Sequence, residues 1–60
     1  MRFTVKMTMT SKEDPKRMNI RTFYGLTGSQ VLHVVGDCHA DAKRYAQFWH
    51  TTITFYEEVE

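Results

Sequence analysis

The stretch DCHADAKRYAQFWH, from Asp37 to His50, decides the fold that this sequence predicts. Its small and apolar side chains fall on one stripe of a 3.6-residue helix, which holds Cys38, Ala42, Tyr45, Ala46 and Trp49. The charged and amide side chains of the stretch fall outside this stripe. A single helix of this length cannot bury Tyr45 and Trp49 by itself, so we expect a β-sheet to receive its apolar face.

The neighbours of this stretch predict where the helix begins and ends. Gly36 ends the preceding segment, and Asp37 is a good N-cap residue because its carboxylate can accept bonds from free backbone N–H groups. Asp41 lies near the first turn, where the helix dipole favours a negative charge. Thr51 and Thr52 are β-branched and favour extended backbone. The sequence therefore predicts one helix over residues 37–50.

Four strands are expected around this helix. Residues 2–10 alternate, with Phe3, Val5, Met7 and Met9 on one face and polar side chains on the other, which is typical of a half-buried strand. Residues 18–24, 30–35 and 52–59 predict three further strands. The second and third are joined by a turn over residues 25–28, where two glycines can take positive φ. The polar segment Ser11–Arg17, with Pro15, predicts an exposed loop.

The predicted order β-β-β-α-β gives one α+β domain over residues 1–60, with a single four-stranded sheet and one amphipathic helix packed on one face. The helix is expected to cross from the third strand to the fourth with right-handed connectivity. The order of the strands stays open, with the first and fourth as one candidate parallel pair. The expected core consists of Phe3, Val5, Met7, Ile20, Val31 or Leu32, Val34 or Val35, Ala42, Tyr45, Ala46, Trp49, Ile53 and Phe55.

Charge and composition narrow the classes of function. Eight basic and seven acidic residues argue against binding nucleic acid through bulk charge. Residues 1–30 nevertheless carry six basic and two acidic side chains, whereas residues 31–60 carry two basic and five acidic ones. This asymmetry indicates either two solvated surfaces or a polar molecule suited to an anionic partner or to head-to-tail self-association.

The compartment is predicted from what the sequence does not contain. Cys38 is the single cysteine, so an internal disulfide cannot form, and a small secreted domain would normally need one. The N-terminal segment alternates with Thr and Lys instead of forming the apolar centre of a signal peptide. No run approaches the ~20 apolar residues that span a bilayer. We therefore expect a cytoplasmic protein that does not enter a membrane.

The sequence gives little support to two kinds of chemical site. A metal site would have to use His33, Cys38, His39 and His50, but no CxxC or HxxxH pair supports it. Cys38 near a helix N-terminus could be a nucleophile, yet it begins the apolar stripe and the chain leaves little room for a pocket. The expectation is a protein that is not an enzyme and holds no metal or cofactor.

Binding surfaces give the two remaining hypotheses. Sheet edges accept a strand from another chain, and exposed aromatic side chains mark interfaces. The leading hypothesis is a protein interface, with a host protein or a second copy as partner, built from Phe23, Tyr24, Phe48 and Tyr56. The alternative is a single-stranded nucleic-acid surface on which a ring stacks bases and cations contact phosphates. Its residues would be Arg2, Lys6, Lys16, Arg17, Arg21 and Phe23.

Residues 31–59 resemble the strand-helix-strand portion of the T7-type inhibitors of host RNA polymerase, small early proteins of tailed bacteriophages. The resemblance rests on the Asp37 cap, the pair Asp41-Ala42, Ala46, the pair Phe48-Trp49 and the closing strand. The acidic strip of those inhibitors is not matched. The resemblance implies a phage- or prophage-encoded accessory protein that modulates a host process by binding a host protein, without implying the polymerase as target.

Overall fold

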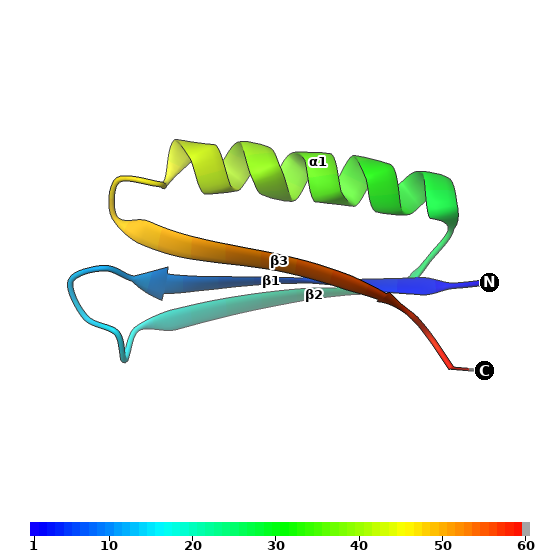
Figure 1. The fold of residues 1–60 in the computed structure, drawn as a ribbon, viewed down its shortest axis with the longest axis horizontal. Helices are drawn as coiled ribbons and strands as arrows, with labels where there is room; N and C mark the ends of the chain where they lie inside the picture. The colour runs from blue at the N-terminus through cyan, green and yellow to red at the C-terminus, as the bar shows by residue number, and fades with distance from the viewer. Residues whose placement is uncertain (60) are drawn as a thin grey trace.

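The computed structural model describes residues 1–59 and places one helix across one face of an antiparallel sheet (Figure 1). Along the chain the elements are β1 (Phe3–Ser11), β2 (Met18–Leu26), α1 (Gly28–Arg44) and β3 (Trp49–Glu57). The strand order is β2-β1-β3, and β1 pairs antiparallel with both neighbours. Strands β2 and β3 therefore run in the same direction, with β1 between them, and α1 connects them across the sheet.

The third predicted strand, residues 30–35, is wrong, because these residues form the first turns of α1. Thr27 is the N-cap: its hydroxyl accepts a bond from the Gln30 amide, and the Gln30 side chain accepts one from the Thr27 amide. This capping box satisfies two backbone donors at once. The apolar stripe then continues without a break from Val31 to Cys38, so packing overrides the strand preference of the valines.

The predicted helix end is also wrong. Helix α1 ends at Arg44, with Tyr45 as its C-cap, and a turn leads directly into β3 at Trp49. Asp37 is not the N-cap, since it lies in the middle of the helix. Trp49 contacts the core from the start of a strand, not from the helix stripe. The α+β class with one helix on one face of a sheet is confirmed, but the described sheet has three strands, not four.

The first and last strands lie side by side, as in the candidate that the sequence left open, but their relative direction differs from it. Strands β1 and β3 are neighbours, but they are antiparallel. The hairpin between β1 and β2 reverses the chain once, and the crossover through α1 returns it in the direction of β2. The last strand therefore opposes β1, and β1 becomes the central strand of the sheet.

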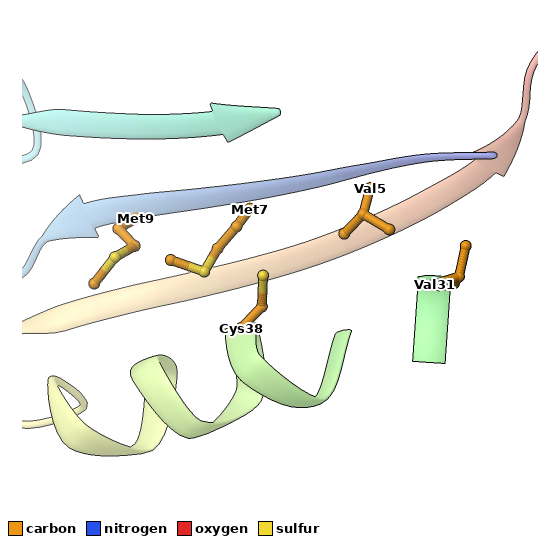
Figure 2. Packing of buried hydrophobic residues seen from close by; sticks show 5 residues of the cluster. All are labelled: Val5, Met7, Met9, Val31 and Cys38. Carbon is orange, nitrogen blue, oxygen red and sulfur yellow. The ribbon is translucent and has the colours of Figure 1, made fainter. Parts of the chain in front are cut away.

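The core lies between α1 and the inner face of β1. Val5, Met7 and Met9 point from β1 toward Val31 and Cys38 of the helix (Figure 2). Val5 and Met7 are almost fully buried, at 0% and 1% exposure. A second group of apolar side chains packs around these five and is partly buried: Phe3, Phe23, Leu26, Val34, Val35, Trp49 and Ile53. The expected core included all of these except Phe23 and Leu26, with Val34 and Val35 as alternatives.

Four members of the expected core are exposed, and one of them, Ala46, lies in the turn after α1. Ile20 pairs with Thr8, on the face of the sheet that the helix does not cover, and is 51% exposed. Phe55 is on the helix side but belongs to an edge strand, and 59% of it is exposed. Tyr45 lies just beyond the end of α1 and is 42% exposed. A single helix is too narrow to cover all three strands.

The observed helix start can be tested at its cap. Thr27→Ala should lower the free energy of unfolding by about 1 kcal/mol, because it removes the capping box. Asp37→Ala, at an exposed position inside α1, should leave stability unchanged or raise it slightly, because Ala is the better helix former. Chemical denaturation of both variants measures the difference. A larger loss for Asp37→Ala would contradict the helix boundaries described here.

The position of the core predicts unequal effects at two methionines. Met7→Ala should cost about 2–5 kcal/mol of stability, because it empties the centre of the core. Met18→Ala is the matched control: Met18 is 58% exposed at the start of β2, and its loss should stay within about 0.5 kcal/mol. Urea unfolding distinguishes the two. Equal losses would show that β1 is not the central buried strand.

Candidate protein interface at the sheet edges

The two edges of the sheet are β2 and β3, and hydrogen bonds at the two ends of the β1–β3 ladder define which groups of β3 are free. The Glu58 amide donates to the Arg2 carbonyl at 2.8 Å, and the Lys12 amide donates to the Phe48 carbonyl at 2.9 Å. Hydrogen-bonded pairs alternate along an antiparallel ladder, so the even-numbered residues of β3 bond to β1. The odd-numbered residues Thr51, Ile53, Phe55 and Glu57 direct their N–H and C=O groups outward, whereas the Trp49 amide donates to the Tyr45 carbonyl at 3.0 Å.

Strand β3 has none of the features that usually protect an edge. Its nine residues, WHTTITFYE, contain no proline, glycine, lysine or arginine. Its register with β1 is regular from Phe3 opposite Glu57 to Ser11 opposite Trp49. Natural edge strands are normally shortened, bulged or charged, because a regular edge is a template for another strand. The β3 edge is therefore competent to bind an extended segment through its backbone.

Strand β2 is a protected edge by comparison. Its register with β1 shifts between Phe3 and Val5, where Tyr24 and Gly25 lie opposite Thr4. This bulge needs Gly25, whose φ of +67° is the left-handed conformation that other residues rarely adopt. Bulges twist a strand away from regular pairing, so β2 is the poorer acceptor of a partner strand.

A carboxylate fastens the C-terminal segment to this bulge. The Glu58 Oε2 atom accepts a bond from Thr4 Oγ1 at 2.7 Å and one from the Gly25 amide at 2.6 Å. The Arg2 guanidinium donates to the Gly25 carbonyl at 3.2 Å. Thr4 is 1% exposed although it lies on the face away from the helix. These bonds join β1, β2 and the end of β3 at one end of the sheet.

The same bonds change the acidity of Glu58. Hydrogen bonds from the Gly25 backbone and the Thr4 hydroxyl lower the pKa of its carboxyl below the ordinary value of 4.5. A folded-state pKa below the unfolded one means that the ionised carboxylate stabilises the fold. This contribution is complete above pH 4.5 and is lost as the pH falls through the lowered pKa.

The four aromatic residues of the predicted interface do not form one patch. Phe23 packs on the core from the helix side of β2. Tyr24, 72% exposed, is at the bulge, and Phe48, 62% exposed, is in the turn before β3. Tyr56, 53% exposed, is on the outer face of β3. Of these four residues, only Tyr56 belongs to β3 and lies at its edge.

Sequence reasoning missed two side chains beside this edge, Phe55 and Leu32. The sequence predicts Phe55 in the core and gives Leu32 as one of two core alternatives in a strand, but Leu32 is 76% exposed on α1. Leu32 lies two helical turns before His39, which borders β3, so both residues are on the same side of α1. The capping box Thr27-x-x-Gln30 was the signal that could have placed Leu32 on a helix.

A hollow of about 450 Å³ lies beside the start of β3, between this strand and the last turns of α1. We call it the β3 hollow; its lining includes Lys12, His39, Lys43, Trp49, His50 and Thr51. The Thr51 hydroxyl is buried there without a hydrogen-bond partner among the described residues. The two lysine side chains give this end of the strand a positive charge. Glu57, at the other end of β3, is exposed.

A smaller hollow, of about 170 Å³, lies beside β2 and is lined by Met9, Asn19, Arg21, Tyr45 and Trp49. Arg21 Nη1 lies 3.3 Å from Asp41 Oδ2 of α1 and donates a hydrogen bond to it. Both side chains are substantially exposed, so this ion pair contributes at most about 1 kcal/mol. Its role is to connect α1 with β2.

The six residues of the nucleic-acid alternative are distributed over several surfaces. Lys6 is on the outer face of β1, whereas Arg21 and Phe23 pair with Met7 and Val5 on the helix face. The Arg2 side chain bonds the bulge, and Lys16 and Arg17 belong to the loop between β1 and β2. The structure therefore does not place a stacking ring among these cations.

Cys38 is a core residue, at 4% exposure. Burial, followed by the nearby charge of Asp41, raises the pKa of its thiol. This is the opposite of the shift that a reactive thiolate requires. Among residues 1–59, no group of three His, Cys, Asp or Glu side chains is placed to hold a metal ion. In the same range, no helix is both long and apolar enough to cross a bilayer.

Comparison with known proteins gives no relative: no protein-family model, curated protein or solved structure matches the chain.

The Glu58 contacts predict a specific pH dependence. Glu58→Gln should lower the stability at pH 7 and reduce the loss of stability between pH 5 and the acid range, because the ionised form is the one that is bonded. Glu57→Gln removes the neighbouring exposed carboxylate and is the control. Thermal unfolding across this range measures the effect. Parallel pH profiles for wild type and Glu58→Gln would contradict it.

Proposed function

We propose that this chain is a small, non-enzymatic protein-binding module that receives a partner strand along the free edge of β3. The observation that carries this proposal is the regular row of outward backbone groups on residues 51–57, in which Glu57 at the end of the strand is the one charged residue. In strand addition, backbone bonds supply affinity and the flanking side chains supply specificity. Phe55 and Tyr56 flank the edge on its two faces, and both are more than half exposed.

The rest of the chain supports a binding role more than a catalytic one. The thiol of Cys38 is buried, and the two hollows beside the strands are open surface depressions without a paired nucleophile and base. The resemblance to the phage polymerase inhibitors adds one expectation, namely that the partner is a host protein in the bacterial cytoplasm and that the chain modulates a host process.

The single-stranded nucleic-acid alternative receives less support. Its cations are spread over both faces of the sheet and a loop, and Phe23 packs on the core. A surface of this kind would bind only through diffuse charge, with an affinity that falls steeply with salt. Salt-resistant binding of a short oligonucleotide that depends on Phe23 would restore this alternative.

The proposal predicts that one substitution at the edge abolishes binding. Phe55→Lys should reduce capture of a protein partner from bacterial lysate at least tenfold, because a lysine at the edge opposes strand addition. Tyr24→Lys, at the bulged edge, is the matched control and should bind like the wild type. The readout is quantitative mass spectrometry of proteins retained by each immobilised variant. Equal retention by both variants would overturn the use of the β3 edge.

A further inference from the structure

The chain exposes more surface than a monomer of its size should. Its accessible surface is 4682 Å², whereas a folded chain of 7.1 kDa is expected to expose about 4,100 Å². The excess of about 600 Å² approaches the roughly 800 Å² that each partner buries in a standard interface. Three large apolar side chains on or beside β3 contribute to it: Leu32, Phe55 and Tyr56.

The two ends of β3 carry opposite charge. Lys12 and Lys43 border the β3 hollow at the start of the strand. Glu57 is the last residue of β3, at the opposite end. An antiparallel pair of identical strands places the start of one against the end of the other. Two copies of β3 would therefore bring Glu57 of each to the cationic end of its partner, which is the charge complementarity that favours self-association.

The alternation of bonds along β3 restricts the register. Ile53 is the central residue of the strand and is among those with outward N–H and C=O groups. If Ile53 pairs with its own copy, all nine residues of both strands are paired. Phe55 then lies opposite Thr51 of the second copy, and Glu57 lies opposite Trp49, all on the helix face. Thr51 and Trp49 line the β3 hollow, so this register directs Phe55 and Glu57 into it.

We infer that the partner of the β3 edge is a second copy of this chain, paired antiparallel through β3 about a two-fold axis at Ile53. The inference rests on the proposed function, because it uses the same edge. The dimer is a six-stranded sheet with both helices on one face. Each copy inserts Phe55 into the hollow of the other and places Glu57 beside Lys43 there. Each contact occurs twice, as two-fold symmetry requires.

The mass in solution is the first test. Sedimentation equilibrium of the full chain over a concentration series should give twice the 7.1 kDa chain mass. Phe55→Lys should give the monomer mass at the same concentrations, and Tyr24→Lys should remain dimeric. A monomer at every concentration of the wild type would overturn the inference.

A charge exchange tests the contact in the hollow. Glu57→Lys and Lys43→Glu should each weaken the dimer roughly tenfold, because each replaces two opposite-charge pairs with two like-charge pairs. The double variant Lys43→Glu/Glu57→Lys should recover the wild-type dissociation constant. Asp37→Lys makes the same charge change one turn from Asp41, on the β2 side of α1, and should have no effect. Failure of the double variant to recover would overturn the proposed contact.

Disulfide formation tests the register. With Ile53 on the axis, Thr52 of one copy lies opposite Thr54 of the other at about 4.5 Å between Cα atoms, within reach of a disulfide. A mixture of Thr52→Cys and Thr54→Cys chains should cross-link as a heterodimer under mild oxidation, and neither variant alone should do so. Cross-linking of Thr52→Cys by itself would overturn this register, because it requires Thr52 to face its own copy.

The inference and the proposed function fail in different ways. A monomeric wild type that still captures a lysate protein, with capture lost in Phe55→Lys, retains the edge as a binding site and overturns the second copy as its partner. A monomer that captures no protein overturns both. A dimer with charge-exchange recovery supports the β3 edge as a binding site and the second copy as the partner that occupies it.

Discussion

Everything in this structure depends on the burial of one face of β1 beneath α1. Val5 and Met7 are almost fully enclosed because β1 is flanked by a strand on each side and covered by the helix (Figures 1 and 2). Among the described residues, only five apolar side chains are buried, with exposed fractions between 0% and 7%. A chain of this size has a small free energy of unfolding. Loss of the contact between β1 and α1 would therefore remove most of the apolar burial that holds the helix on the sheet.

The small core also explains why so much apolar surface is left over. One helix lies mainly over β1 and β3, and it leaves Ile20 and Tyr56 on an uncovered face and Phe55 at an edge. The two edges then differ in kind. The Gly25 bulge makes β2 irregular, and the Glu58 carboxylate bonds it to the C-terminal segment, whereas β3 stays regular and directs the backbone groups of Thr51, Ile53 and Phe55 outward. This asymmetry is the reason that we propose β3, and not β2, as the edge that receives a partner strand.

Much of the sheet and part of the candidate interface were predictable from local pattern. The alternation in residues 2–10 identified the central strand and its buried face, and the outward position of Tyr56 followed from the same rule. The run Val31–Val35 was not predictable from apolarity alone, since it suits a buried strand and a helix equally. The helix is favoured by the Thr27–Gln30 capping box and by the apolar stripe that continues to Cys38. Leu32, one of the expected core alternatives, therefore lies on an exposed side of α1.

The sequence by itself determined an α+β chain with a half-buried first strand, an amphipathic helix containing Cys38 and Ala42, and a polar loop before the second strand. These features are local, because side-chain periodicity and turn residues act over a few positions. Only the tertiary structure decided that β1 is central, that β3 is an unprotected edge and that Glu58 reaches Thr4 and Gly25. Those outcomes depend on which distant segments pair, and pairing is determined by how one helix and three strands together bury the most apolar surface.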